Sequence, residues 1–221
     1  MPSFEIKTLG CKVNSFDSNA IHTQLSELGW SHNQTDPDLY IINSCTVTEN
    51  ANKQSRYEAR RIRRRFPNIK VAITGCYAQT DSASLTSEES VSYIIPNETK
   101  HEIGNLLNEA WTKQPSNKIL GSAKAVKDNK QSHFKSSVTL FEKAKTQNAR
   151  AFVKIQDGCN GFCSYCIIPY ARGASRSVHS DLVLQEITRL TEAGFKEIVL
   201  TGIHLGAVSY THLTLPTTPY V

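Results

Sequence analysis

Three of the six cysteines stand within eight residues, at Cys159, Cys163 and Cys166. Their C-x3-C-x2-C spacing places three thiols on one short loop, whereas a closed structural zinc site takes four ligands. Such a density of thiolates is typical of iron–sulfur clusters. In a cluster of four irons, three cysteines leave one iron free to bind a small molecule, which gives the loop a chemical use. A zinc site completed by His179 or His204 is the alternative.

The other three cysteines, Cys11, Cys45 and Cys76, lie far apart in the sequence but share a local setting. Each ends a short apolar stretch that predicts a strand. The carboxyl ends of parallel strands share one edge of the sheet, where open α/β folds bind ligands. We therefore expect the three thiols to meet at that edge. The alternative is three small side chains buried in a core, as free cysteines commonly are.

Strand-like and helix-like stretches alternate over the first hundred residues. The expected strands are 3–10, 38–45, 69–76 and 90–97. The expected helices are 15–30, 48–66 and 100–111. This alternation predicts an α/β fold with an open parallel sheet flanked by helices.

Changes in composition divide the chain into four parts. Residues 1–112 form the expected N-terminal domain, and residues 113–148, rich in Lys, Ser, Asn and Gln, form a linker with one short strand near 136–141. Residues 149–207 read as strand, cysteine loop, helix and strand, which is a βαβ crossover. Residues 208–221 have neither helical nor strand period. We interpret them as a non-native tail on a fragment, with a natural short C-terminus as the alternative.

Composition restricts the cellular setting. The chain has 221 residues and a net charge of +5, which permits a polyanionic partner without establishing one. No apolar run approaches the roughly 20 residues that span a bilayer, and the N-terminus lacks the pattern of a secretory signal. We therefore expect a cytoplasmic protein without a membrane partner. Thiols stay reduced there, so spaced cysteines indicate metal or redox chemistry more often than disulfides.

The segment "GCNGFCSYCIIPYARG" resembles the signature loop of the radical S-adenosylmethionine enzymes. Its continuation through Ile167 to Ser177 resembles the methylthiotransferase family in particular. "TLGCKVN", "NSCTVT" and "TGCYAQ" resemble the three cysteine motifs of that family's N-terminal domain, and "LTGIHLG" resembles its next barrel strand. The resemblance runs from about Phe4 to Gly206, apart from the linker.

The resemblance implies an N-terminal α/β domain followed by the first strands of an incomplete radical S-adenosylmethionine partial β/α barrel. It also implies two [4Fe–4S] clusters and S-adenosylmethionine as cofactors. Cys159, Cys163 and Cys166 would hold the cluster that cleaves S-adenosylmethionine, with Tyr165 and Gly202 as further cofactor-binding residues. Cys11, Cys45 and Cys76 would hold an auxiliary cluster associated with sulfur donation. No catalytic acid–base pair is expected, because inserting sulfur at an unactivated C–H bond needs a radical.

Family members modify adenosines beside the tRNA anticodon or an aspartate of a ribosomal protein. "TLGCKVN" resembles the subgroup that acts on N6-threonylcarbamoyladenosine, with the isopentenyladenosine and ribosomal-protein subgroups as alternatives. The implied partners are a tRNA anticodon stem-loop and a reducing electron donor, and not DNA.

An arginine stripe at Arg56, Arg60 and Arg64 either contacts RNA phosphates or is a solvated helix face. Two other classes also explain six cysteines: an iron–sulfur electron-transfer or carrier protein, and a zinc-stabilised RNA-binding module.

Overall fold

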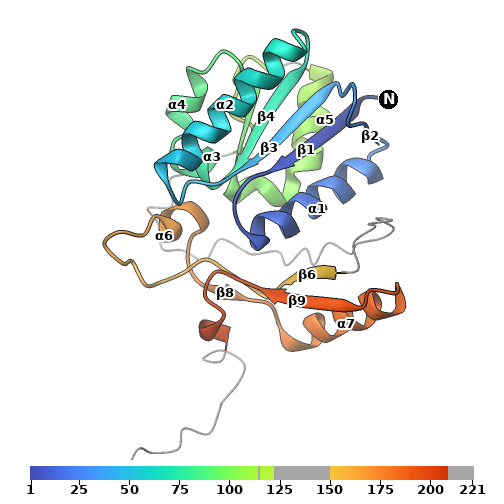
Figure 1. Cartoon of the computed structure of the whole chain (residues 1–221), viewed down its shortest axis with the longest axis vertical. Coiled ribbons are helices and arrows are strands. Elements are labelled where there is room, and N and C mark those ends of the chain that lie inside the picture. The colour runs from blue at the N-terminus through green and yellow to red at the C-terminus, as the bar shows by residue number, and fades with distance from the viewer. Residues whose placement is uncertain (114, 122–149, 209–221) are drawn as a thin grey trace, which may run out of the picture.

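The computed structural model describes residues 1–113, 115–121 and 150–208. The first part is a five-stranded parallel sheet in the order β2-β1-β3-β4-β5 (Figure 1). The strands are β1 (Ser3–Thr8), β2 (Ser31–His32), β3 (Leu39–Ser44), β4 (Lys70–Gly75) and β5 (Tyr93–Pro96). The helices are α1 (Lys12–Glu27), α2 (Glu49–Arg65), α3 (Cys76–Thr80), α4 (Ser82–Thr86), the 3-10 turn η1 (Asn97–Glu102) and α5 (Ile103–Lys113). The expected α/β class is confirmed.

Helices cover both faces of this sheet, which explains the continuous apolar runs of its central strands. All six residues of β3 are buried. Successive strand residues point to opposite faces. Ile41 therefore packs in the core beneath α1 and α5, and Ile42 packs in the core beneath α2, α3 and α4. Strands buried on both faces have no polar side to expose.

The chain changes direction between β1 and β3. Helix α1 leads from β1 outward to the edge strand β2, whereas α2 leads from β3 in the opposite direction to β4. The two helices lie on opposite faces of the sheet (Figure 1). A crevice at the carboxyl ends of the strands is the usual ligand site of open α/β sheets at such a switch point.

A second unit begins at β6 (Arg150–Lys154), which pairs in parallel with β9 (Glu197–Thr201). Helix α7 (Ser180–Glu192) lies between the two strands in the chain and connects them. The expected βαβ crossover is thus confirmed. Between β6 and α7, the strands β7 (Gln156–Asp157) and β8 (Arg176–Ser177) pair antiparallel and close the cysteine loop. Helix α6 (Ile168–Arg172) lies within that loop and packs against α3 of the first part (Figure 1).

Five short elements, β2, α3, α4, α6 and β8, had no sequence prediction. Within the expected linker, Ile119 bridges to Ile94 of β5, and Leu120 is buried in the core. The strand expected near 136–141 and residues 209–221 of the expected tail lie outside the described residues. Over the part of the chain that the structure describes, no helix combines the length and apolar character needed to cross a membrane.

Candidate functional site

The three distant cysteines lie at the carboxyl edge of three neighbouring strands. Cys11 follows β1 and is the N-cap residue of α1, Cys45 follows β3, and Cys76 begins α3 directly after β4. We call Cys11, Cys45 and Cys76 the edge triad. It lies at the switch point between β1 and β3 and at the adjoining strand β4.

The thiols of the edge triad are near enough to one another to interact electrostatically. Gly10 has a φ of +100°, and a side chain there would begin 3.0 Å from the Cys45 Sγ atom, so the backbone before Cys11 passes directly over Cys45. Burial raises the pKa of the Cys45 thiol, and the neighbouring Cys76 and Cys11 thiols raise it further. The structure therefore brings together three cysteines that the sequence separates by 65 positions from first to last.

Buried amide side chains hold the strand ends that carry these thiols. Asn14 Nδ2 donates to Leu9 O at 2.7 Å and to Ser44 O at 2.9 Å, which ties the end of β1 to the end of β3. Asn43 Nδ2 donates in turn to Asn14 O at 2.8 Å. Sequence reasoning missed both asparagines. The available signal was an asparagine in two of the cysteine motifs, in each case directly after an apolar residue.

The strand before Cys76 also approaches its neighbour closely. Gly75 has a φ of +98°, and a side chain there would begin 2.3 Å from Ser44 O. Only glycine fits this contact, because both the backbone conformation and the space exclude a Cβ atom. The close approach sets Cys76 beside the end of β3.

The clustered cysteines follow β7, and we call Cys159, Cys163 and Cys166 the loop triad. The Cys159 and Cys163 sulfurs lie 3.4 and 3.7 Å from the place where a side chain on Gly161 would begin. Cys166 N donates to Cys163 O at 2.9 Å, which closes the turn between the last two thiols. Cys159 is anchored to the base of the loop, since its N–H donates to Gly173 O at 3.1 Å.

The other expected cofactor residues lie on opposite parts of this unit. Tyr165 is 90% exposed on the loop. Gly202 follows β9 and abuts the buried side chain of Gln156. Gln156 joins the two segments: its Oε1 accepts from the His204 N–H at 2.7 Å, and its Nε2 donates to Gly158 O at 2.8 Å. Gln156 was not among the predicted site residues.

The donor chemistry of both triads fits iron–sulfur clusters. All six cysteines are free. Among the described residues, no three His, Cys, Asp or Glu side chains converge closely enough for a single metal ion. A cubane does not require such convergence, because each thiolate binds a different iron. A closed zinc site does require several side chains to converge on one ion. The structure does not bring His179 or His204 together with the thiols in this way.

A set of buried charged side chains joins the two parts of the chain beside the edge triad. We call it the buried network, and its members are Asp17, Lys100, Lys154, Asp157 and Arg172. Asp17 of α1 pairs with Lys154 of β6 at 2.7 Å and with Lys100 of η1 at 3.2 Å. Arg172 at the end of α6 pairs with Asp157 at 3.0 Å. The network fixes α6, and therefore the loop triad, relative to the edge triad.

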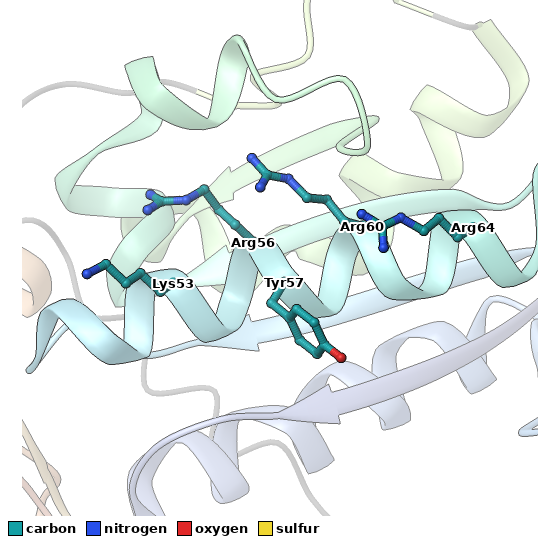
Figure 2. A pocket seen from close by; sticks show the side chains of 5 residues that line it. All are labelled: Lys53, Arg56, Tyr57, Arg60 and Arg64. Atoms are coloured by element: carbon teal, nitrogen blue, oxygen red, sulfur yellow. The ribbon is translucent and has the colours of Figure 1, made fainter.

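The arginine stripe on α2 lines a shallow groove formed by Lys53, Arg56, Tyr57, Arg60 and Arg64. In Figure 2, Arg56 and Arg60 extend to one side of the helix and Tyr57 to the other. Arg56 donates to the Tyr77 hydroxyl, and Arg60 pairs with Glu88 at 2.5 Å. Two of the three stripe arginines therefore also hold neighbouring elements of their own domain.

The chain is similar in sequence to several known proteins. Residues 3–96 match the uncharacterized protein family UPF0004. The threonylcarbamoyladenosine tRNA methylthiotransferase MtaB of Bacillus subtilis is 37% identical over 93% of this chain and 44% of its own length. The protein of the same name from Aquifex aeolicus is 34% identical over 90% of this chain and 47% of its own length.

A tRNA-2-methylthio-N(6)-dimethylallyladenosine synthase from Pelagibacter ubique is 30% identical over 93% of this chain and 46% of its own length. The chain thus spans a little under half of the length of the curated relatives that it matches. These matches support an MtaB-like methylthiotransferase N-terminal part.

Proposed function

We propose that the full-length protein carrying this chain is a radical S-adenosylmethionine methylthiotransferase that acts on tRNA. The proposed reaction converts N6-threonylcarbamoyladenosine next to the anticodon into its 2-methylthio derivative. The observation that carries the proposal is the presence of two thiol triads, one at the switch point of the sheet and one on the loop that contains α6. The names of the two MtaB relatives support the choice of substrate.

Each triad has its own proposed cluster. The edge triad would hold a [4Fe–4S] cluster associated with sulfur donation. The loop triad would hold a second [4Fe–4S] cluster and S-adenosylmethionine, with Tyr165 and Gly202 as further contacts. When bound, the loop cluster supplies the electron that cleaves S-adenosylmethionine, and with it the radical chemistry that an unactivated C–H bond requires. The chain itself binds, orients and separates the two groups.

The proposed partners follow from this chemistry. A reducing electron donor must supply the loop cluster, and Cys163, which is exposed, gives it access to that loop. The anticodon stem-loop of tRNA is the proposed substrate, in the cytoplasm. The groove on α2 supports an RNA partner less strongly than the thiol triads do, because Arg56 and Arg60 already contact Tyr77 and Glu88 of the protein.

Isopentenyladenosine in tRNA is the second candidate substrate, favoured by the relative from Pelagibacter ubique. An iron–sulfur carrier is less well supported, because it gives no reason for the methylthiotransferase relatives or for a second thiol triad on its own loop.

Nucleoside mass spectrometry of tRNA tests the proposed reaction. In a strain that lacks the full-length gene, we expect the 2-methylthio derivative of N6-threonylcarbamoyladenosine to disappear and its unmodified precursor to accumulate. The wild-type gene should restore it, and a gene with Cys163→Ala should not. Loss of the 2-methylthio derivative of isopentenyladenosine instead would select the second candidate, and an unchanged set of nucleosides would contradict both.

A further inference from the structure

Arg172 differs from the lysines of the buried network in its hydrogen bonding. Nη1 pairs with Asp157 at 3.0 Å, and Nη2 donates to Asn14 Oδ1 at 2.5 Å. The Nε–H is buried and has no hydrogen-bond partner within the described residues. Native structures rarely leave a buried donor unpaired, because its lost hydration is not replaced. The geometry therefore leaves one donor of Arg172 free for a group that the described residues do not provide.

The end of α6 lies directly beside the edge triad. Asn97 Nδ2 donates to Ala171 O at 2.8 Å and also lies 3.6 Å from Cys76 Sγ. Burial opposes the charge of Arg172, but the nearby carboxylates and the Cys76 and Cys11 thiols raise the pKa of the guanidinium well above its ordinary value. Arg172 is thus the cation that α6 of the second unit presents to the thiols of the first.

The charges of the buried network do not balance. It contains three cations, Lys100, Lys154 and Arg172, against the two anions Asp17 and Asp157, which leaves one formal positive charge in excess. Burial lowers the pKa of Lys100, and the carboxylate of Asp17 opposes that shift. A buried excess charge is stable only when an opposite charge accompanies it. The edge triad adjoins the network at Arg172, and the thiolates of a bound cluster would bring negative charge there.

We propose that Arg172 is a positioning residue for the anionic iron–sulfur group of the edge triad, donating its Nε–H to a sulfur of that group and favouring its reduced state. This inference rests on the proposed function, because it assumes a cluster at the edge triad. Net charge and hydrogen bonds to the sulfurs set the reduction potentials of such clusters. Since α6 begins two residues after Cys166, the segment that carries the loop triad thereby tunes the group of the edge triad.

A redox titration of one isolated cluster tests this inference. The full-length protein with Cys159→Ala, Cys163→Ala and Cys166→Ala retains only the edge triad, and its reduced cluster is followed by electron paramagnetic resonance. We expect Arg172→Gln to lower the ratio of reduced to oxidised cluster at a fixed potential about tenfold, which is about 59 mV for one electron. Arg172→Lys restores the charge, and we expect it to recover most of the shift.

Lys154→Gln is the matched control. Lys154 is a cation of the same network with 12% of its side chain exposed, and it forms ion pairs with Asp17 and Asp157. We expect this variant to be less stable than the parent but to keep the parent's potential. If Arg172→Gln does not fold, the double variant Asp157→Asn with Arg172→Gln removes one charge of each sign from the network. Because its net charge is unchanged and only the hydrogen bond is lost, it should show a smaller shift in the same direction.

The outcomes separate the two proposals. An unchanged potential in the Arg172→Gln variant, or an equal shift in Lys154→Gln, would overturn the role of Arg172 and leave the proposed function intact. If the background protein with only the edge triad binds no iron, the auxiliary cluster itself is wrong, and the inference fails with it.

Discussion

Cys163→Ala in the full-length protein is expected to abolish S-adenosylmethionine cleavage, whereas Cys45→Ala is expected to leave cleavage intact and abolish formation of the methylthio product. The reason is the separation of the two triads onto different elements, with Cys163 on the loop and Cys45 at the edge of the sheet. Loss of groups that merely support metal ligands typically costs 10–100-fold in affinity or activity, so loss of a direct ligand should cost more than about 100-fold.

The measurement for this prediction is the rate of S-adenosylmethionine cleavage under reducing conditions, together with the yield of methylthiolated tRNA. Both variants are first compared with the wild type by urea unfolding, so that loss of fold is not mistaken for loss of a ligand. Equal loss of cleavage in the two folded variants would contradict separate roles for the triads.

Asp17→Asn is expected to lower the free energy of unfolding by about 3–5 kcal/mol, because it leaves buried cations without their partner. Asp17 is buried, lies 2.7 Å from Lys154 and 3.2 Å from Lys100, and joins α1 to the second unit. Urea unfolding at pH 7 gives the measurement. The control is Glu49→Gln, which breaks an exposed pair with Lys53 and should change stability little.

The pH dependence of this effect follows from the sign of the pKa shift. Burial opposes ionisation of Asp17, but the three cations of the buried network hold the pKa of its carboxyl well below the ordinary value. Its stabilising contribution is therefore complete above the ordinary pKa of about 3.9 and is lost as the pH falls below it. The difference between wild type and Asp17→Asn should shrink below about pH 4. A variant as stable as the wild type at pH 7 would show that the network does not hold the two parts together.

The sheet could be predicted from the sequence because its central strands are short, mostly apolar and buried on both faces. The run that forms β3 has no competing helical period, and Cys45 marks its end. By contrast, β2 has only two residues and α3 and α4 have five each, which is too short for a periodic pattern to develop. Their positions depend on tertiary contacts, such as the close approach of Gly75 to the end of β3.

The position of the edge triad could be predicted for the same reason: a cysteine after each parallel strand leads to one edge. The charged residues that surround the edge triad could not be predicted from the sequence. Asp17 and Lys154 are 137 positions apart, and each alone reads as an ordinary surface charge. Arg172 lies within a motif quoted for its cysteines, but only the packing of α6 against α3 shows that it faces the other triad. Long-range pairs of this kind leave no local signal in a single sequence.

The iron content of the full-length protein after anaerobic reconstitution tests the central claim most directly. Two four-iron clusters predict about eight irons per chain, with a matching amount of sulfide. Cys11→Ala, Cys45→Ala and Cys76→Ala together should lower this to about four, and so should Cys159→Ala, Cys163→Ala and Cys166→Ala together. Stoichiometric zinc without iron, or an iron content that does not change when the edge triad is removed, would contradict the assignment of one cluster to each triad.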